Sequence, residues 1–156
     1  MRLETEPPAL DPSKQVDHVS IVPMQNLNEG LMQLDTEMNP VPGLAESYEV
    51  NKTATEYTFH LRKGVKWSDG VELTAKDFEY AWKRMLDPKV AAEYSYFLYD
   101  LKNAEAYNTG KLKTADKVGV KATGKYTLKV SLRSSAIYWF NIPAFVVTYP
   151  VREVIV

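Results

Sequence analysis

Apolar side chains recur at helical spacing between Thr74 and Leu86, where Phe78, Ala81, Trp82, Met85 and Leu86 fall on one face of a helix. Thr74 and Asp77 have the spacing of a capping box, with aspartate in place of the usual glutamate or glutamine. Asp87-Pro88 ends the pattern, because the residue before proline is pushed out of the α region. The pattern therefore predicts a capped amphipathic helix whose apolar face lies on a core.

Apolar and polar residues alternate in two other places, and each alternation predicts a β-hairpin with one buried face. In the first, strands at 44–50 and 56–62 are joined by a loop at 51–55. In the second, strands at 118–122 and 126–132 turn around Thr123-Gly124. The side chains expected to point inward are Tyr57, Phe59 and Leu61 in the first hairpin and Tyr126, Leu128, Val130 and Leu132 in the second.

Weaker patterns cover the rest of the chain. In the N-terminal part they predict an extended segment over 1–18, a helical segment over 19–31 with Pro23 at or near its first turn, a short strand over 31–34 and a turn over 39–43. Further along they predict a second helical region over 91–108, which ends at Asn108-Thr109-Gly110, and an aromatic tail over 137–150. We interpret the fold class as α+β, with antiparallel β-hairpins packed against two or more helices.

Composition narrows the functional classes. A chain of 156 residues suits one domain with a real core. The net charge of −1 gives no electrostatic footprint for nucleic acid or an anionic membrane. The absence of cysteine excludes disulfides and thiolate chemistry, and no apolar run is long enough for a membrane span. No signal peptide is recognisable, and Met1-Arg2-Leu3 is interpreted as an imposed start.

Catalytic chemistry has little support in the sequence. His18 and His60 are far apart and have no metal-ligand spacing, so we predict no metal site and no cofactor. Three aspartates could be combined into an acid–base pair, but each is better explained by local structure: Asp69 by a turn, Asp77 by the cap and Asp87 by the helix end. We predict no catalytic residues and therefore no enzyme.

Aromatic residues are the other candidates for chemistry, since they make up 12% of the chain. Most fall at inward positions and are expected to be core. Trp67, beside a turn, and Tyr94, after Pro88, are less clearly buried, so both are candidates for ligand contact. Exposed aromatic side chains also stack on sugars, so a carbohydrate-binding module stays open as an alternative, as does a pure interaction domain.

The exact residues of several short motifs are more informative about function than the pattern of apolar and polar positions. Five blocks are similar, in order and spacing, to motifs of the family 5 extracellular solute-binding proteins, the oligopeptide- and dipeptide-binding receptors of ABC importers. The blocks are Glu6–Pro12, Leu27–Leu31 with Pro42–Ser47, Tyr57–Arg62 with Trp67–Gly70, Leu73–Phe78, and Val118–Lys121 with Tyr126–Val130. Asp87-Pro88 followed by Tyr94 and Tyr96 resembles the oligopeptide receptors most.

The resemblance implies a mechanism and a site. Receptors of this family hold an extended peptide between two lobes by main-chain hydrogen bonds, which bind peptides without reading their side chains. Aligned on the family motifs, the ligand-facing segment falls at Val16, Asp17 and His18, and the contacting tyrosine of the small lobe falls at Tyr94. Some members carry an acidic residue where Val16 stands here, so the charge would have to come from Asp17.

The resemblance also implies an organisation. Members are roughly three times longer than this chain, so we expect a fragment, with the second ligand-binding lobe missing. Residues 1–28 are expected to be an N-terminal segment of the large lobe and residues 29–156 the small accessory lobe of a type II (cluster C) periplasmic-binding-protein-like fold.

The implied partners are an oligopeptide and an ABC transporter permease, without nucleic acid. The implied location is extracytoplasmic, in the periplasm or as a cell-surface lipoprotein whose lipid anchor is absent from this chain. A receptor of the same family for dipeptides, nickel chelates or oligosaccharides remains an alternative.

Overall fold

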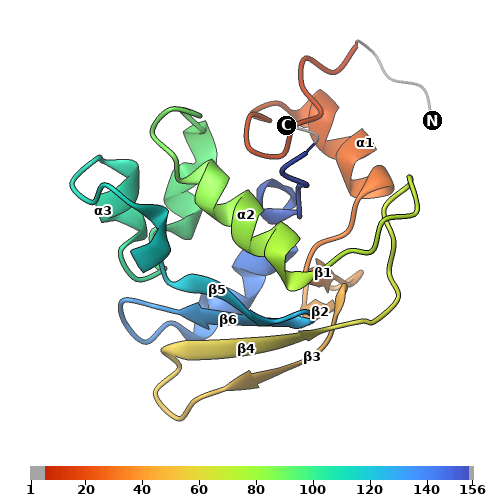
Figure 1. The fold of residues 1–156 in the computed structure, drawn as a ribbon. Helices are drawn as coiled ribbons and strands as arrows, with labels where there is room; N and C mark the ends of the chain where they lie inside the picture. The colour runs from red at the N-terminus through yellow and green to blue at the C-terminus, as the bar shows by residue number, and fades with distance from the viewer. Residues whose placement is uncertain (1–5, 155–156) are drawn as a thin grey trace.

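A computed structural model describes residues 6–154, so the interpretation of Met1–Leu3 as an imposed start lies outside the described residues. The main sheet has four antiparallel strands in the order β3-β4-β6-β5 (Figure 1). The strands are β3 (Ala45–Val50), β4 (Glu56–Leu61), β5 (Val120–Gly124) and β6 (Thr127–Ser131). The two predicted hairpins are therefore confirmed, and β4 joins β6 to make one sheet of them.

The second hairpin turns later than predicted. β5 continues through Gly124, which pairs with Thr127, and the turn is formed by Lys125 and Tyr126. The register shifts between Ala122 and Gly124, which gives the strand one extra residue and moves the turn toward the C-terminus. Tyr126 is consequently a turn residue rather than a strand residue, while its half-buried side chain packs against the core as predicted.

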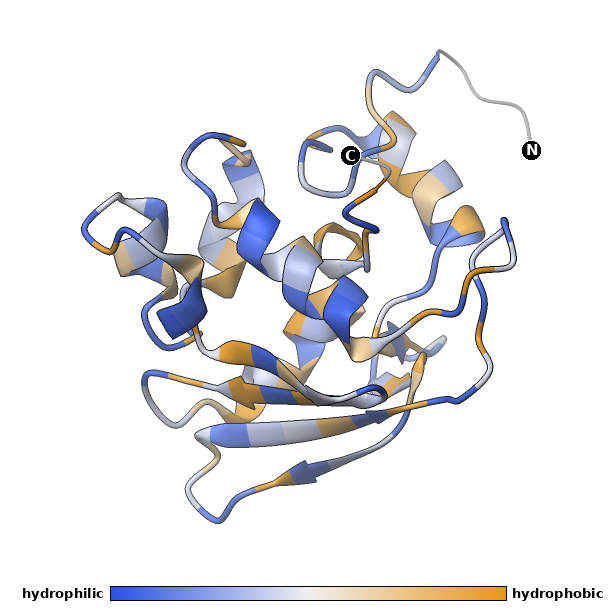
Figure 2. Ribbon diagram, viewed as in Figure 1, coloured by the Kyte–Doolittle hydropathy of each residue, from blue (hydrophilic) through white to orange (hydrophobic). Residues whose placement is uncertain are grey.

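One face of the main sheet is buried and the other is open to solvent. Along β4, Tyr57, Phe59 and Leu61 are buried while the alternating residues are only partly buried. Tyr57 pairs with Val130 and Phe59 with Leu128, so the apolar rows of β4 and β6 share one face. Figure 2 shows the same alternation of hydrophobic and hydrophilic positions along β5 and β6.

The predicted amphipathic helix is α2 (Ala75–Met85), which crosses the buried face of the sheet (Figure 1). Phe78, Trp82 and Met85 are buried against the core, as predicted. The Asp77 carboxylate accepts the backbone N–H of Thr74 at 2.7 Å, which confirms its capping role. The helix ends before Asp87-Pro88, also as predicted.

The aromatic tail contacts both the sheet and α2 through Trp139. It forms two 3₁₀ helices, η3 (Ile137–Ala144) and η4 (Val146–Thr148). The Trp139 ring lies 5.2 Å from the Tyr57 ring of the sheet and 5.9 Å from the Trp82 ring of α2. Two buried hydrogen bonds hold the tail, because Tyr57 donates to the Ala136 carbonyl and Trp82 to the Thr148 carbonyl, both at 2.8 Å.

The predicted second helical region is broken in two. Residues 93–98 form the 3₁₀ helix η1 (Glu93–Leu98), and only Ala104–Asn108 form an α-helix, α3. Between them Leu101 forms a β-bridge with Leu132, in which Lys102 donates to the Ser131 carbonyl and the Asp100 carbonyl accepts from Arg133. These two main-chain groups are therefore unavailable to a continuous helix. Asn103 then adopts a left-handed φ of 62°. The predicted end of the region is right, since Gly110 follows α3 with a φ of 75°.

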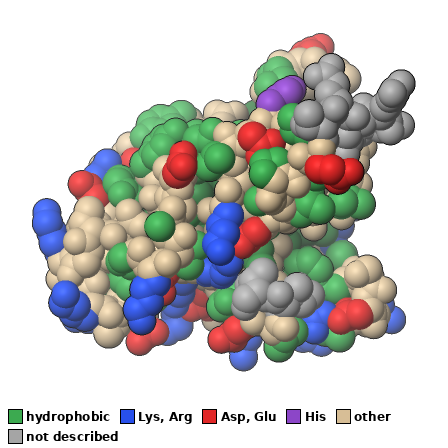
Figure 3. Space-filling view, turned by 90° about the horizontal axis from the view of Figure 1, so that it is seen from above, with side chains coloured by type: hydrophobic (Ala, Val, Ile, Leu, Met, Phe, Trp, Pro, Cys, Tyr) green, Lys and Arg blue, Asp and Glu red, His purple; other side chains and the backbone are tan. Residues whose placement is uncertain are grey.

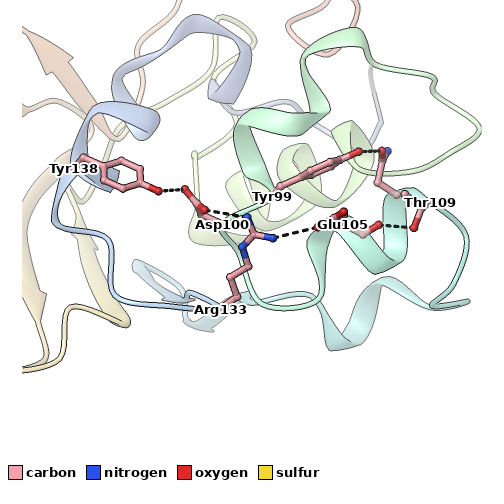
Figure 4. A network of polar contacts seen from close by, with 7 residues as sticks. Tyr99, Asp100, Glu105, Thr109, Arg133 and Tyr138 are labelled. Atoms are coloured by element: carbon pink, nitrogen blue, oxygen red, sulfur yellow. Dashed lines mark hydrogen bonds and ion pairs between the residues drawn. The ribbon is translucent and has the colours of Figure 1, made fainter.

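A network of polar side chains braces this break (Figure 4). Tyr138 of the tail donates a hydrogen bond to Asp100 at 2.8 Å. Arg133, just after β6, forms ion pairs with Asp100 at 3.7 Å and with Glu105 of α3 at 3.1 Å. Because Arg133 is half exposed, we assign the network a positioning role rather than a large share of stability.

The N-terminal part departs from prediction in two places. Helix α1 (His18–Leu27) places Pro23 in its second turn rather than near its first. Strand β1 (Met32–Leu34) is confirmed, but Pro40–Pro42 pair with it as β2, so the predicted turn over 39–43 is wrong. The turn is made earlier by Asp35, whose carboxylate accepts the N–H groups of Glu37 and Asn39 at 2.9 Å each. No helix among residues 6–154 is long and apolar enough to cross a membrane.

We expect Trp82→Ala to unfold the chain or nearly so. Trp82 is fully buried, and truncation of a buried tryptophan costs about 3–5 kcal/mol, comparable to the stability of a small domain. The control is Tyr96→Ala, which removes an aromatic ring that is 54% exposed. Thermal melts of both variants test the prediction. Equal melting temperatures for the two variants would show that Trp82 is not a core residue.

Candidate functional site

The structure brings two of the predicted site elements together. Val16, Asp17 and His18 lie where the N-terminal segment enters α1, and Tyr94 lies in η1. The Tyr94 hydroxyl is 3.4 Å from the Val16 carbonyl oxygen and donates a long hydrogen bond to it. Two residues 78 positions apart in sequence therefore meet at one surface. Val16 is 42% exposed, so it is accessible from solvent.

Asp17 caps α1. Its carboxylate accepts the backbone N–H and the hydroxyl of Ser20, each at 2.7 Å. The hydroxyl of Ser20, together with the backbone N–H groups of the first turn, lowers the pKa of Asp17 below its usual value. The carboxylate is therefore ionised at neutral pH, with part of its hydrogen-bonding capacity directed at the helix. His18, the first residue of α1, is exposed.

In the main chain of this segment, the carbonyl groups have hydrogen-bond partners, whereas the N–H groups have no main-chain acceptor within the described residues. The Val16 carbonyl accepts from Tyr94, and the Asp17 carbonyl accepts from the Gln15 side chain. Within residues 6–154, neither Val16 nor Asp17 donates its N–H to another main-chain carbonyl. Two consecutive main-chain N–H groups of this segment are therefore not used in main-chain hydrogen bonds within the described residues.

An ion pair that the sequence did not reveal fixes the segment. The Asp11 carboxylate accepts two hydrogen bonds from the Arg84 guanidinium of α2, at 2.8 and 2.7 Å, and both side chains are mostly buried. The pair raises the pKa of Arg84. The Asp11 main-chain carbonyl also accepts from Lys14 and Gln15 at 3.0 Å, so the ion pair holds a turn. Because Val16 directly follows this turn, the turn determines the position of Val16.

Tyr94 belongs to an aromatic cluster of four rings, whose other members are Tyr96, Phe97 and Phe145. Phe97 is stacked on Tyr96 at 4.8 Å and lies 4.8 Å from Phe145. Tyr94 contacts all three rings edge-on, at 5.8–6.3 Å. The face seen from above in Figure 3 carries several groups of exposed hydrophobic side chains. The spacing of residues 94, 96 and 97 was a visible signal for this cluster, but Phe145 comes from the tail and could only be found in three dimensions.

Trp67, the other aromatic candidate, lies elsewhere. It is half buried and lines an open cavity of about 360 Å³ between the C-terminal end of α1 and the turn over 66–73. Its indole N–H is buried and has no partner within the described residues. Asn28, Glu29 and Lys66 also line the cavity. Trp67 is therefore not part of the surface formed by Val16 and Tyr94.

The acidic and histidine candidates do not converge. Asp69 accepts the Val71 N–H and pairs with Arg152, and Asp87 accepts the Lys89 N–H at 2.8 Å, so both have the predicted local roles. His60 lies on the open face of the sheet beside Glu49 at 3.3 Å. Within the described part of the chain, no three histidine or acidic side chains are grouped so as to hold a metal ion.

Comparison with known proteins decides the family. Residues 39–155 match the family described as bacterial extracellular solute-binding proteins, family 5 Middle. The chain belongs to the family 5 solute-binding proteins. The resemblance noted in the sequence is thereby confirmed, and so is the mixed helix and antiparallel-sheet fold class.

Individual members of family 5 cover almost the whole chain. The oligopeptide-binding protein OppA of Bacillus subtilis is 43% identical over 98% of this chain, and the dipeptide-binding protein DppE of the same organism is 41% identical over 96%. A crystal structure of the substrate-binding domain of an oligopeptide ABC transporter from Bacillus anthracis covers 95% of the chain with a TM-score of 0.92 and 44% identity. The chain spans only 28%, 27% and 28% of these proteins, respectively.

Replacing Arg84 by methionine should loosen the Asp11 turn without unfolding the sheet. The variant keeps the aliphatic stem but removes two charge-assisted hydrogen bonds, worth about 1–2 kcal/mol together in this partly buried setting. We expect hydrogen exchange at Lys14 and Gln15 to accelerate about ten-fold. Lys83→Met is the control, because Lys83 pairs with Glu79 within α2. Unchanged exchange at Lys14 and Gln15 would mean that the ion pair does not hold the turn.

The Asp17 cap should make the start of α1 sensitive to acid. Because folding lowers the pKa of Asp17, its stabilisation is fully present above the unfolded value of about 3.8 and is lost as the pH falls through the folded value. Protection of the Ser20 amide should therefore be constant at neutral pH and fall under acid conditions. Asp17→Asn keeps a cap but removes the titration, so the fall should disappear. A fall that persists in Asp17→Asn would assign it to another group.

Proposed function

We propose that this chain is a portion of an oligopeptide-binding receptor of an ABC importer, and that Val16, Asp17, His18 and Tyr94 face the peptide. The observation that carries the proposal is the contact of Tyr94 with Val16, beside two main-chain N–H groups that have no main-chain acceptor within the described residues. An extended peptide binds to such donors through its own main-chain carbonyls, so its sequence is not read. The names of the similar proteins, which include oligopeptide and dipeptide receptors, support the ligand class.

The proposal assigns roles to Val16, Asp17 and Tyr94, and places His18 beside them. Val16 and Asp17 offer main-chain N–H groups to the peptide. Tyr94 holds the Val16 carbonyl and presents its ring, backed by three further aromatic rings, as the wall beside the peptide. Asp17 adds a negative charge near this wall, since its carboxylate is ionised at neutral pH. His18 lies at the exposed N-terminal end of α1.

The lobe boundary is also part of the proposal, with residues 1–28 assigned to the large lobe and residues 29–156 to the small accessory lobe. The chain crosses itself tightly just after this boundary. A side chain on Gly30 would meet the Pro143 carbonyl at 2.7 Å, and one on Gly43 would meet the Gly30 carbonyl at 2.7 Å. Such close main-chain packing supports a fixed exit for the segment that leads into the small lobe.

The remaining assignments follow from the family. We propose that the longer receptor works outside the cytoplasm, in the periplasm or as a lipoprotein at the cell surface, and delivers its peptide to a membrane permease. A second lobe would cover the peptide from the other side. Enclosure matters because hydrogen bonds to the peptide are stronger when water is excluded.

Calorimetric titration with a mixed peptide library tests the proposal. We expect tight binding by the longer receptor and weak or no binding by the 156-residue chain alone, because one lobe leaves the peptide exposed. Tyr94→Ala in the longer receptor should weaken binding about ten-fold while lowering stability by less than about 1 kcal/mol. Tyr138→Ala is the control, since Tyr138 is 60% exposed and, like Tyr94, forms one hydrogen bond through its hydroxyl.

Two results would contradict the proposal in different ways. Micromolar or tighter binding by the chain alone would overturn the two-lobe mechanism. Equal effects of Tyr94→Ala and Tyr138→Ala on peptide binding would remove Tyr94 from the site. A parallel titration with oligosaccharides covers the alternative ligands, and binding of sugars without binding of peptides would replace the ligand class.

A further inference from the structure

Positive charge is concentrated in one part of the chain. Residues 102–131 contain seven lysines and two acidic residues, a net charge of +5, while the other 126 residues carry −6. The nearly neutral total hides this separation. A local excess of one sign of charge creates a potential that attracts ligands of the opposite sign. The chemistry of this region is therefore different from that of the whole chain.

Four of these lysines line one cavity. Lys102, Lys117, Lys121 and Lys129 surround a volume of about 440 Å³, and no acidic side chain lines it. Lys129 pairs with Glu56 at 3.2 Å. Within residues 6–154, Lys102, Lys117 and Lys121 form no ion pair at all. The ammonium groups of these three lysines are therefore not neutralised by an ion pair within the described residues.

The strand pairing keeps two of the lysines together at a cost. Lys121 of β5 lies directly opposite Lys129 of β6 in the antiparallel register. Like charges at directly opposed positions destabilise a sheet. An anion bound between them would remove this repulsion. The Glu56 carboxylate that pairs with Lys129 offsets part of this repulsion in the empty protein, and a bound anion would offset the rest.

The floor of the cavity is fixed by main-chain hydrogen bonds. Gly119 donates to the Lys102 carbonyl, Lys102 to the Ser131 carbonyl, and Ser131 to the Gly119 carbonyl, all at 2.7–2.8 Å. A side chain on Gly119 would lie 2.1 Å from the Ser131 carbonyl oxygen, so three segments meet where only glycine fits. The Asn103 side chain also donates to the Lys117 carbonyl at 2.8 Å. The lysines thus project from a rigid base.

We propose that this cavity, which we call the lysine pocket, binds a phosphate-bearing anion. Its four lining lysines supply charge, and the hydrogen-bonded floor fixes the main chain from which they extend. The phosphate can come from a free ion or from the headgroup of an anionic lipid, and the two sources share the same chemistry of recognition. The lysine pocket shares no residue with the Val16–Tyr94 surface, so this inference is independent of peptide binding.

The test compares two triple variants of the 156-residue chain. Lys102→Gln/Lys117→Gln/Lys121→Gln removes the three unpaired lysines of the pocket. Lys52→Gln/Lys76→Gln/Lys89→Gln changes the net charge equally at exposed positions outside it. One arm titrates inorganic phosphate by calorimetry, and the other measures cosedimentation with phosphatidylcholine vesicles with and without phosphatidylglycerol. The two arms distinguish a free phosphate from a lipid headgroup.

We expect binding in at least one arm, and a loss of about five-fold per lysine, or on the order of 100-fold for the pocket variant. The control variant should lose no more than about two-fold. Binding should also weaken as salt is raised, because exposed charges are screened. Absence of binding in both arms, or equal losses in the two triple variants, would overturn the proposal.

A single variant keeps the test decisive if the pocket variant does not fold. Lys121→Gln removes one member of the opposed pair and should lower anion binding about five-fold. Without anion, the same variant should melt at a higher temperature than the unmodified chain in low salt, because the repulsion with Lys129 is gone. An unchanged melting temperature together with unchanged anion binding would show that the opposed lysines have no role in a site.

Discussion

The contact on which this structure most depends is the aromatic layer formed by Tyr57, Trp139 and Trp82. The sheet supplies the first ring, the tail the second and α2 the third, so one layer joins the sheet, the tail and α2. Each outer residue also donates a buried hydrogen bond to the tail. These hydrogen bonds satisfy the buried polar atoms of Tyr57 and Trp82, and burial of the three rings removes large apolar surfaces from water.

The position of the candidate site follows from this layer. Trp82 fixes α2 on the core, and Arg84, two residues later, holds the Asp11 turn from which Val16 extends. The tail contributes again, because it runs on from Trp139 to Phe145, which lies in the ring cluster of Tyr94. Both sides of the Val16–Tyr94 surface are therefore positioned by elements that the same aromatic core secures.

The sequence patterns predicted the elements whose formation depends on residues close together in the chain. The capped helix over 74–86 and the two hairpins follow from apolar spacing, and the structure confirms them. The break between η1 and α3 was not predictable, because the Leu101–Leu132 bridge that causes it joins distant segments. The Asp11–Arg84 pair and the contact of Phe145 with Tyr94 were not predictable for the same reason, since each also joins distant segments. For the site, sequence similarity indicated Val16 and Tyr94, but only the fold shows that they are in contact.

The central claim is that Val16 and Asp17 offer main-chain donors to an extended peptide. Hydrogen exchange of the longer receptor, with and without bound peptide, tests it most directly. The account predicts that the amides of Val16 and Asp17 become strongly protected when peptide binds, while the amides of β5 and β6 are unchanged. Peptide binding that leaves the exchange of Val16 and Asp17 unaltered would contradict it.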